Sequence, residues 1–517
     1  MQAAPDLARR VAELEALLAE REAALRGAER LIEQLRLQLA QLRRQQFGRS
    51  SEKLEASIQQ LELRLEDLEE AQGVTAARTA APAPRTSGRR AAARPPLPQH
   101  LPREDVLHHP GSVCPGCGGT HLSALGEDVT EVLETIPARL KVVRHVRPKF
   151  SCRACETILQ APAPDLPIRK GRPGAGLIAQ VVVDKYLDGL PLYRQSARLA
   201  REGLEIGRDV LADWVGHAAW WLTPLAERIA AHVMAAPVLH TDDTPVALLA
   251  PGLGKTRTAR LWTYVLDERS WLGPRPPAAL YRFSPDRKQA RPHGHLQGFA
   301  GAIQADAYSG YETLTRGQAP PRILHVACWA HARRKFFEIH ETTASPIAEE
   351  ALRRIQALYA IEARITGSPP DMRRAIRQAE TVPLLAHFKD WLEDQRRRLS
   401  AKSALAKAIG YALARWSALT CYAGDGRYAI DNNSAERALR GIAVTRKNYL
   451  FLGSQTGGER AATLYTIIET ARMNGLDPQG YIAAIIDRMA CGHPMTRIDE
   501  LLPWNWRQEH NQPGTAA

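Results

Sequence analysis

Two apolar runs that each end in an aspartate constrain the fold of this 517-residue chain more than any other feature. LHTDDTPV carries Asp242 and GAIQADAYSGY carries Asp306, and both run from apolar residues into an acid and then into turn formers. This is the pattern of buried strands that end at a site. The 64 positions between the two acids (306 minus 242) hold two further strand-like runs, RLWTYVLDE and AALYRFS. The sequence therefore predicts a β-sheet with carboxylates at its strand ends.

A third acid, Glu436 in DNNSAERALR, lies on a predicted amphipathic helix. Magnesium prefers oxygen ligands in a near-octahedral array and leaves positions for phosphate oxygens. Two such ions about 3.5 to 4 Å apart can activate an attacking oxygen and stabilise a leaving one at phosphorus. Asp242, Asp306 and Glu436 therefore predict a site for two magnesium ions, with manganese as an alternative ion, and a phosphodiester as substrate.

Neighbouring acids compete for two of these roles. Successive side chains on a strand point to opposite faces, so only one of Asp242 and Asp243 can face the metals. Asp431 is the rival of Glu436, but it precedes the helix and is better placed to cap it, with Asn432 and Asn433 as alternative caps.

Five blocks of the chain carry a resemblance to a known family: LHTDDTPV, IQADAYSGY, VACWAHARRKFF, DNNSAERALR and RKNYLFLGSQTGGERAATLYTIIETARMNGLDP. Together they resemble DDE transposases of the insertion sequence sixty-six type, over almost the whole length from FGRSSEK onward. The resemblance implies that Asp242, Asp306 and Glu436 are the catalytic triad of a ribonuclease-H-like domain. That family commonly has Glu at the position of Asp243, and this chain keeps an acid there.

The resemblance implies a metal-dependent strand-transfer enzyme that moves an insertion sequence. Such an enzyme binds terminal inverted repeats in double-stranded DNA, hydrolyses the phosphodiester at the element ends and joins the freed 3'-hydroxyl to target DNA. Companion proteins encoded by the same element often assist. The alternative is a DNA-binding regulator with an inactive ribonuclease-H-like core.

Composition agrees with a DNA partner, because 69 basic against 56 acidic residues give a net charge of +13 and a pI of about 9.5. No apolar run reaches the roughly 18 residues of a membrane helix, and no secretory signal is present. We therefore expect no membrane association and a cytoplasmic, nucleoid-associated protein. Seven cysteines, four of them in two CxxC pairs, indicate metal binding in a reducing compartment.

The predicted fold is multidomain α+β and begins with a coiled coil. Residues 1–70 predict a leucine-zipper-like coiled coil from Leu7, which would pair two chains into a homo-oligomer. An antiparallel hairpin within one chain, or a helix packed on its own globular domain, are the alternatives. Residues 71–103 form a basic linker rich in Pro and Ala, which cannot bury enough apolar surface to fold.

Residues 104–168 predict a zinc-ribbon-like module. The paired cysteines Cys114, Cys117, Cys152 and Cys155 supply the four thiolates of one structural zinc ion, and a redox CxxC is the rival interpretation. The runs VTEVLETI and KVVRHVRPKF, parted near Pro137, predict a β-hairpin between the two pairs.

Residues 169–235 predict a helix-turn-helix DNA-binding domain made of LIAQVVVDKYLDG, PLYRQSARLAREG and IGRDVLADWVGHAAWWL. The last helix would enter the major groove near Arg208, although ordinary helix packing produces the same pattern. Arg194 and Arg198 on the middle helix are further candidates for DNA contact.

Residues 236–480 predict the α/β catalytic domain, with an α-helical insertion at about 345–425, and residues 481–517 form a C-terminal element. Further candidates for phosphate contact are Arg333, Arg334, Lys335, Arg437 and Arg440, although the last two fit a solvated helix face equally well. Cys328 and His331 have zinc-like spacing but no second pair nearby. We therefore interpret them as a packed cysteine and a helix-start histidine and assign them no metal.

Overall fold

The computed structural model describes residues 140–151, 158–160, 162–169, 171–250, 255–315, 322–448 and 451–506. The predicted coiled coil and linker, and the cysteines Cys114, Cys117, Cys152 and Cys155, lie outside these ranges. The chain divides into two compact units at Pro164–Asp165. Each unit is described by itself.

In the described part of the smaller unit, β1 (Lys149–Ser151) and β2 (Ile158–Gln160) form an antiparallel pair, in which Phe150 lies opposite Leu159. The predicted strand over KVVRHVRPKF is wrong for residues 141–148, which have no regular structure. The valines of this run stay exposed, Val142 by 90%, so no core favours a strand there. Pro148 also cannot donate a hydrogen bond to a sheet.

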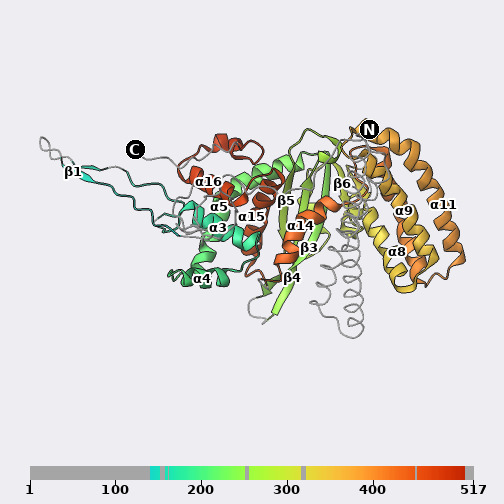
Figure 1. Ribbon diagram of the computed structural model, residues 1–517, viewed down its shortest axis with the longest axis horizontal. Coiled ribbons are helices and arrows are strands. Elements are labelled where there is room, and N and C mark those ends of the chain that lie inside the picture. The colour runs from blue at the N-terminus through green and yellow to red at the C-terminus, as the bar shows by residue number, and fades with distance from the viewer. Residues whose placement is uncertain are drawn as a thin grey trace, which may run out of the picture. The chain divides into compact units, whose positions relative to one another are not determined.

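The larger unit is built around a five-stranded sheet in the order β5-β4-β3-β6-β7 (Figure 1). Its strands are β3 (Val238–Ala250), β4 (Lys255–Leu266), β5 (Ala278–Ser284), β6 (Gly301–Ala305) and β7 (Ile323–Ala327). β3, β4 and β5 form an antiparallel meander, and β6 and β7 run parallel to β3. The strands expected in the four runs of the sequence are thus present, but the expected strand end at Asp242 is wrong, because β3 continues to Ala250 and pairs with β4 beyond Asp242. Asp306 does directly follow its strand, β6.

The three helices expected before the sheet are also present: α3 (Ala175–Tyr186), α4 (Leu192–Arg201) and α5 (Arg208–Met234). The turns between them pass through Gly189 and Gly203, whose φ angles of +68° and +83° are in the left-handed region that glycine adopts without strain. These helices share one hydrophobic core with the sheet and the C-terminal helices.

The three C-terminal helices are α14 (Asn433–Thr445), α15 (Gln455–Met473) and α16 (Pro478–Ala490). Of these, α14 packs against β3 and β4 and α15 against β5, whereas α16 packs against α3, α5 and α15 (Figure 1). α15 covers the edge strand β5, because the hydroxyls of Thr470 and Thr466 accept the N–H groups of Ala279 and Tyr281 at 3.2 and 3.0 Å. A covered edge cannot pair with another chain.

The predicted insertion is helical, and its helices share a second hydrophobic core with α8 (Trp329–Thr343) and with residues of β3, β6 and β7. The insertion follows α8 and consists of α9 (Pro346–Ile365), α10 (Pro370–Ile376), the π-helical segment η3 (Arg377–Thr381), α11 (Val382–Arg398), α12 (Ala404–Ala414), α13 (Trp416–Thr420) and the 3-10 turn η4 (Cys421–Gly424). Shorter elements elsewhere are η1 (Arg269–Trp271), α6 (Ala290–His295), α7 (Ser309–Glu312), η2 (Thr313–Thr315) and η5 (Met495–Leu501).

A buried arginine joins the helices of the insertion. The side chain of Arg377 has no exposed surface and forms a two-pronged ion pair with Glu362 of α9, at 2.8 and 2.7 Å. The same guanidinium donates to the carbonyls of Tyr422, Asp425 and Tyr428, each at 2.8 Å. Arg377 therefore holds α9, η3, η4 and the segment after η4 together.

Among the described residues, no helix is both long and apolar enough to span a bilayer.

Candidate functional site

Asp242 and Asp306 come together through the register of two parallel strands. Val238 of β3 lies opposite Ala302 of β6, and His240 opposite Gln304. Two residues further along each strand, the same register sets Asp242 beside Asp306, which directly follows β6. The sheet therefore brings together two acids that are 64 positions apart (306 minus 242).

The chain returns from the insertion to the same edge because Gln304 of β6 holds it there. The Gln304 amide donates to the carbonyls of Ala429 and Asp431 at 2.8 and 3.2 Å, and its oxygen accepts the N–H of Ala429 at 2.9 Å. Gln304 is 1% exposed, so these bonds are made in the interior. They place residues 429–431 at the end of β6, just before α14.

Asn432 makes the second attachment. It is fully buried, and its amide donates to the carbonyl of Thr241 at 2.8 Å, directly before Asp242. Its side-chain oxygen lies 3.3 Å from Nδ1 of His240, and its backbone N–H donates to Sγ of Cys328 at 3.3 Å. Asn432 therefore fixes the start of α14 against β3, and Glu436 follows in the first turn of that helix.

The expected helix caps need one correction. Asn432 occupies the N-cap position of α14, but its side chain makes no capping hydrogen bond because β3 uses it. The carboxylate of Asp431 accepts the N–H of Asn433 at 3.2 Å, as expected for an acid that precedes the helix. The attachments made by Gln304 and Asn432 were missed by the sequence analysis, although both residues stand inside the singled-out blocks.

The electrostatics of Asp242 show that the three acids interact. Burial, and then the charges of Asp306, Asp243 and Glu436, raise the pKa of Asp242 well above its usual value of 3.8. Burial and like charges both disfavour an ionised carboxyl group. A divalent cation among these oxygens would offset both effects, and carboxylate oxygens are the donors that magnesium prefers. The type of donor therefore agrees with the magnesium that the sequence predicts.

Asp243 has a different environment from Asp242. Its side chain is 1% exposed and forms ion pairs with Arg260 at 3.0 Å and Arg287 at 2.8 Å. Arg287 also lies 3.7 Å from the carboxylate of Asp306 and 4.4 Å from the ring centre of Tyr308. Two guanidinium groups balance Asp243, whereas Asp242 faces other acids. The sequence analysis did not single out Arg260 or Arg287.

Cys328 and His331 lie close to Glu436. Cys328 is the N-cap residue of α8, is 3% exposed and is packed in the interior, and His331 lies in the first turn of α8. Nδ1 of His331 is 3.9 Å from Oε1 of Glu436. Burial, and then the charges of Glu436 and Asp431, raise the pKa of Cys328 well above its usual value. The structure thus agrees with a packed cysteine and a helix-start histidine, and it also brings both to Glu436.

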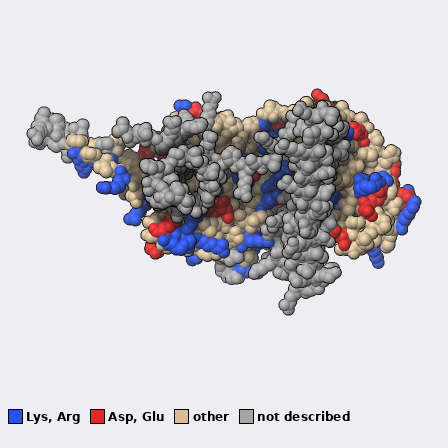
Figure 2. Space-filling model, viewed as in Figure 1, with Lys and Arg blue, Asp and Glu red and all other residues tan. Residues whose placement is uncertain are grey.

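The arginines expected to contact DNA near the helix-turn-helix have different surroundings. Arg194 on α4 is exposed and lies 3.0 Å from the hydroxyl of Tyr193, and Arg208 is exposed at the start of α5. Arg198 is partly buried and pairs with Asp184 of α3. Figure 2 shows Lys and Arg side chains on the surface around α4, with acidic side chains beside them. Arg194 and Arg208 are therefore the more accessible cations here.

The basic residues near the carboxylates lie on α8 and α14. Arg333 stacks on Phe337, and the exposed Lys335 lies 4.5 Å from the ring centre of Tyr411. Arg437 is exposed and donates to the hydroxyl of Ser434 at 3.2 Å. Arg334 and Arg440 are partly buried.

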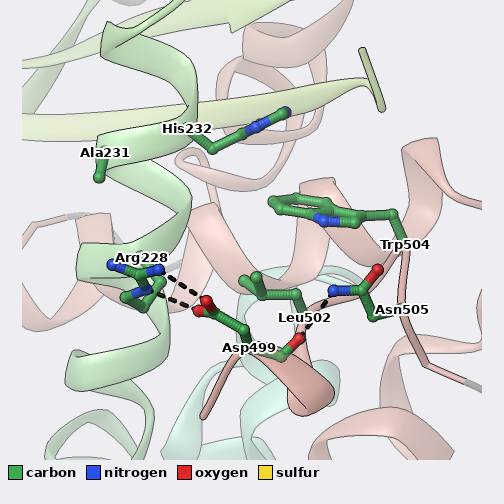
Figure 3. Close-up of a pocket in the computed structure, with 7 residues that line it drawn as sticks. All are labelled: Arg228, Ala231, His232, Asp499, Leu502, Trp504 and Asn505. Atoms are coloured by element: carbon green, nitrogen blue, oxygen red, sulfur yellow. Dashed lines mark hydrogen bonds and ion pairs between the residues drawn. The ribbon is translucent and has the colours of Figure 1, made fainter. Parts of the chain in front are cut away.

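A pocket of about 310 Å³ lies between α5 and the C-terminal residues (Figure 3). Arg228 and Asp499 form a two-pronged ion pair on one side of it, and the ring of Trp504 lies 4.4 Å from that of His232. Asp499 is the single acid among its lining residues, so the pocket does not offer the set of oxygen ligands found at the sheet edge.

Three interacting carboxyl groups beside β3 and β6, on a basic chain, indicate the class of nucleic-acid-processing proteins. Family models identify the particular group. The model of the transposase IS66 family matches residues 170–460, which include the whole sheet, the insertion and α14. This chain belongs to the IS66 family of transposases.

Three further models match other parts of the chain. The model named transposase C of IS166 homeodomain matches residues 34–106, the zinc-finger binding domain of transposase IS66 matches residues 112–156, and the IS66 C-terminal element matches residues 466–504. The zinc-finger match spans all four paired cysteines. The resemblance inferred from the sequence blocks is thus confirmed, as is the order of an N-terminal region, a zinc-finger region and a catalytic region.

Two similar proteins come from Sinorhizobium fredii (strain NBRC 101917 / NGR234). The uncharacterised protein y4hP is 43% identical over 438 residues, which cover 82% of this chain and 79% of that protein. The uncharacterised protein y4jD is 40% identical over 438 residues, covering 83% of this chain and 85% of that protein. Family membership supports a transposase role, with DNA as its partner.

Proposed function

We propose that this protein cleaves the ends of an insertion sequence and joins them to target DNA, with Asp242, Asp306 and Glu436 as its catalytic carboxylates. The observation that carries the proposal is that Asp306 and Glu436 come close enough to Asp242, beside β3 and β6, for their charges to raise its pKa. Perturbed carboxyl groups gathered at one place are typical of active sites. The strand order, with a meander followed by two parallel strands, supports a ribonuclease-H-like core.

Asp242, Asp306 and Glu436 would hold two magnesium ions, which supply activation of the attacking oxygen and stabilisation of the leaving oxygen at phosphorus. Gln304 and Asn432 keep Glu436 in place, because they fasten the start of α14 to β6 and β3. Arg287 positions Asp306 through its charge at 3.7 Å and is itself held by Asp243. Water attacks the phosphodiester at the element end, and the freed 3'-hydroxyl then attacks target DNA without a covalent protein intermediate.

The remaining parts would bring DNA to this site. Arg194 and Arg208 on the helices before the sheet are exposed and suited to phosphate or base contact. The four cysteines Cys114, Cys117, Cys152 and Cys155 would hold one structural zinc ion, and the N-terminal helical region would pair two chains. Changing Cys152 to Ser should release that zinc, and an unchanged zinc content would reject the four-cysteine site.

The test uses purified full-length protein and a DNA duplex carrying the inverted repeat that flanks the gene. Asp242→Asn, Asp306→Asn and Glu436→Gln should each reduce magnesium-dependent strand cleavage to background while leaving DNA-end binding intact. Asp394→Asn, at a half-exposed acid on α11, is the control and should cleave like the wild type. Cleavage that persists in one of the three variants would remove that residue from the triad. End binding by the wild type without any cleavage would instead support a DNA-binding regulator.

A further inference from the structure

The starts of two helices meet beside the carboxylates and carry three side chains of types that bind metals in proteins. Cys328 and His331 come from the N-cap and first turn of α8, and Glu436 from the first turn of α14. One donor atom from each, the cysteine sulfur, a histidine ring nitrogen and a carboxylate oxygen, lie within 4.8 Å of one another. Among the residues that the structure describes, Cys328, His331 and Glu436 form the group of three His, Cys, Asp or Glu donors that lie close enough to share one ion.

The two helix starts are fastened together, so this meeting does not depend on flexible side chains alone. The backbone N–H of Trp329 donates to the carbonyl of Ile430 at 3.1 Å. The N–H of Asn432 donates to Sγ of Cys328 at 3.3 Å, which aims the sulfur toward α14. Cys328 and Asn432 are almost completely buried.

The donor types select the class of cation. Thiolate and imidazole favour zinc and similar transition metals, whereas magnesium and calcium take oxygen ligands. Zinc bonds of about 2.3 Å to sulfur and 2.0 to 2.2 Å to nitrogen or oxygen put tetrahedral ligands about 3.4 to 3.6 Å apart. The nitrogen of His331 and the oxygen of Glu436 are already 3.9 Å apart. Side-chain movements of about 1 Å would close the remaining gaps.

We propose that Cys328, His331 and Glu436 form a site for one zinc-class cation, separate from the four-cysteine module. Three protein ligands leave a fourth position for water, as in open zinc sites. Binding displaces the thiol proton of Cys328, because the thiolate is the ligand. Zinc binding stands on this geometry alone. Its consequence rests on the proposed function: a zinc ion that holds Glu436 takes that carboxylate away from Asp242 and Asp306, so zinc inhibits strand cleavage.

The binding test uses full-length protein whose four-cysteine module is already filled with zinc. Wild-type protein should take up one further zinc or cobalt ion per chain, measured by metal analysis after gel filtration. Cys328→Ser and His331→Gln should each weaken this uptake by at least about tenfold. With cobalt, Cys328→Ser should also lose part of the thiolate-to-cobalt absorption. The control Cys491→Ser, at an exposed cysteine, should bind like the wild type.

His331→Gln keeps the test decisive if Cys328→Ser disturbs the buried packing. The proposal is overturned if wild-type protein takes up no further ion, or if both variants bind it as tightly as Cys491→Ser does.

The inhibition test measures strand cleavage in excess magnesium with and without added zinc. Each rate is divided by the rate of the same protein without zinc, so differences in basal activity cancel. Zinc should inhibit the wild type and Cys491→Ser, and should inhibit His331→Gln at least about tenfold less strongly. Equal inhibition of all three would overturn the competition for Glu436. A wild type that binds the further zinc but never cleaves DNA would refute the proposed function and leave the zinc site standing.

Discussion

Arg377 is the residue whose loss should do the most measurable damage to the helical insertion. Its buried guanidinium makes two hydrogen bonds to Glu362 and three to backbone carbonyls in residues 422–428. In Arg377→Met all five are lost, and a buried carboxylate and three carbonyls lose a donor. Breaking a buried ion pair by removing one partner costs about 3 to 5 kcal/mol. The lower end applies, because Arg373 remains 3.4 Å from Glu362 and still balances part of its charge.

Hydrogen exchange measured by mass spectrometry can locate this loss. A decrease of about 3 kcal/mol in the local free energy of opening speeds exchange by about two orders of magnitude. The increase should appear in peptides from α9, η3 and residues 421–428. Peptides from β3 and β6 should keep their protection, because the attachments made by Gln304 and Asn432 remain in place.

Arg364→Met is the matched control. Arg364 pairs with Glu380 in the same helical insertion, but the two side chains are 59% and 45% exposed. Exposed ion pairs contribute about 0 to 1 kcal/mol, so exchange should change by less than about tenfold. A change of that small size in Arg377→Met, or an equal loss of protection throughout the sheet, would refute the reasoning.

Two further predictions concern buried titratable groups. Burial, and then the charges of Arg282 and Arg291, lower the pKa of His295 to about 4, below the 6.5 of the unfolded chain. The folded state therefore binds fewer protons between these values, so the free energy of unfolding should fall by up to about 3 kcal/mol as pH drops from 6.5 to 4. Denaturant unfolding at several pH values should show a smaller fall in His295→Gln, and an identical fall would exclude this histidine. In metal-free protein, Asp242→Asn should raise the melting temperature, because it removes a buried charge surrounded by acids. Magnesium should stabilise the wild type more than this variant, and equal stabilisation would argue against Asp242 as a ligand.

The sheet and the insertion could be predicted because their signals are local. Alternating or continuous apolar runs before Asp242 and Asp306 mark strands, and helical periodicity marks the insertion. The run before Asp242 did not show that β3 continues to Ala250. The failed strand over residues 141–148 had the same apolar residues without a core to cover them. Local pattern cannot show whether a partner surface exists.

The geometry around Glu436 depends on contacts between distant residues, and no local pattern reveals these. Gln304 and Ala429 are 125 positions apart, and Asn432 and Thr241 are 191 apart. The ion pairs of Asp243 with Arg260 and Arg287 are likewise set by the tertiary fold. The order of the blocks matched a family and so indicated the three acids. It could not indicate which amide groups hold them together.

The backbone hydrogen bond from Trp329 to Ile430 joins the two points between which α8 and the insertion lie. The polypeptide leaves the sheet after β7 at Trp329 and runs through α8 and the insertion. It returns at Ile430, 101 positions later (430 minus 329), where the two backbones share a hydrogen bond of 3.1 Å. Because the departure and return points are bonded to each other, the number of residues between them does not by itself set the place of Glu436. A shorter connector between these two residues would therefore leave the start of α14 at the same place.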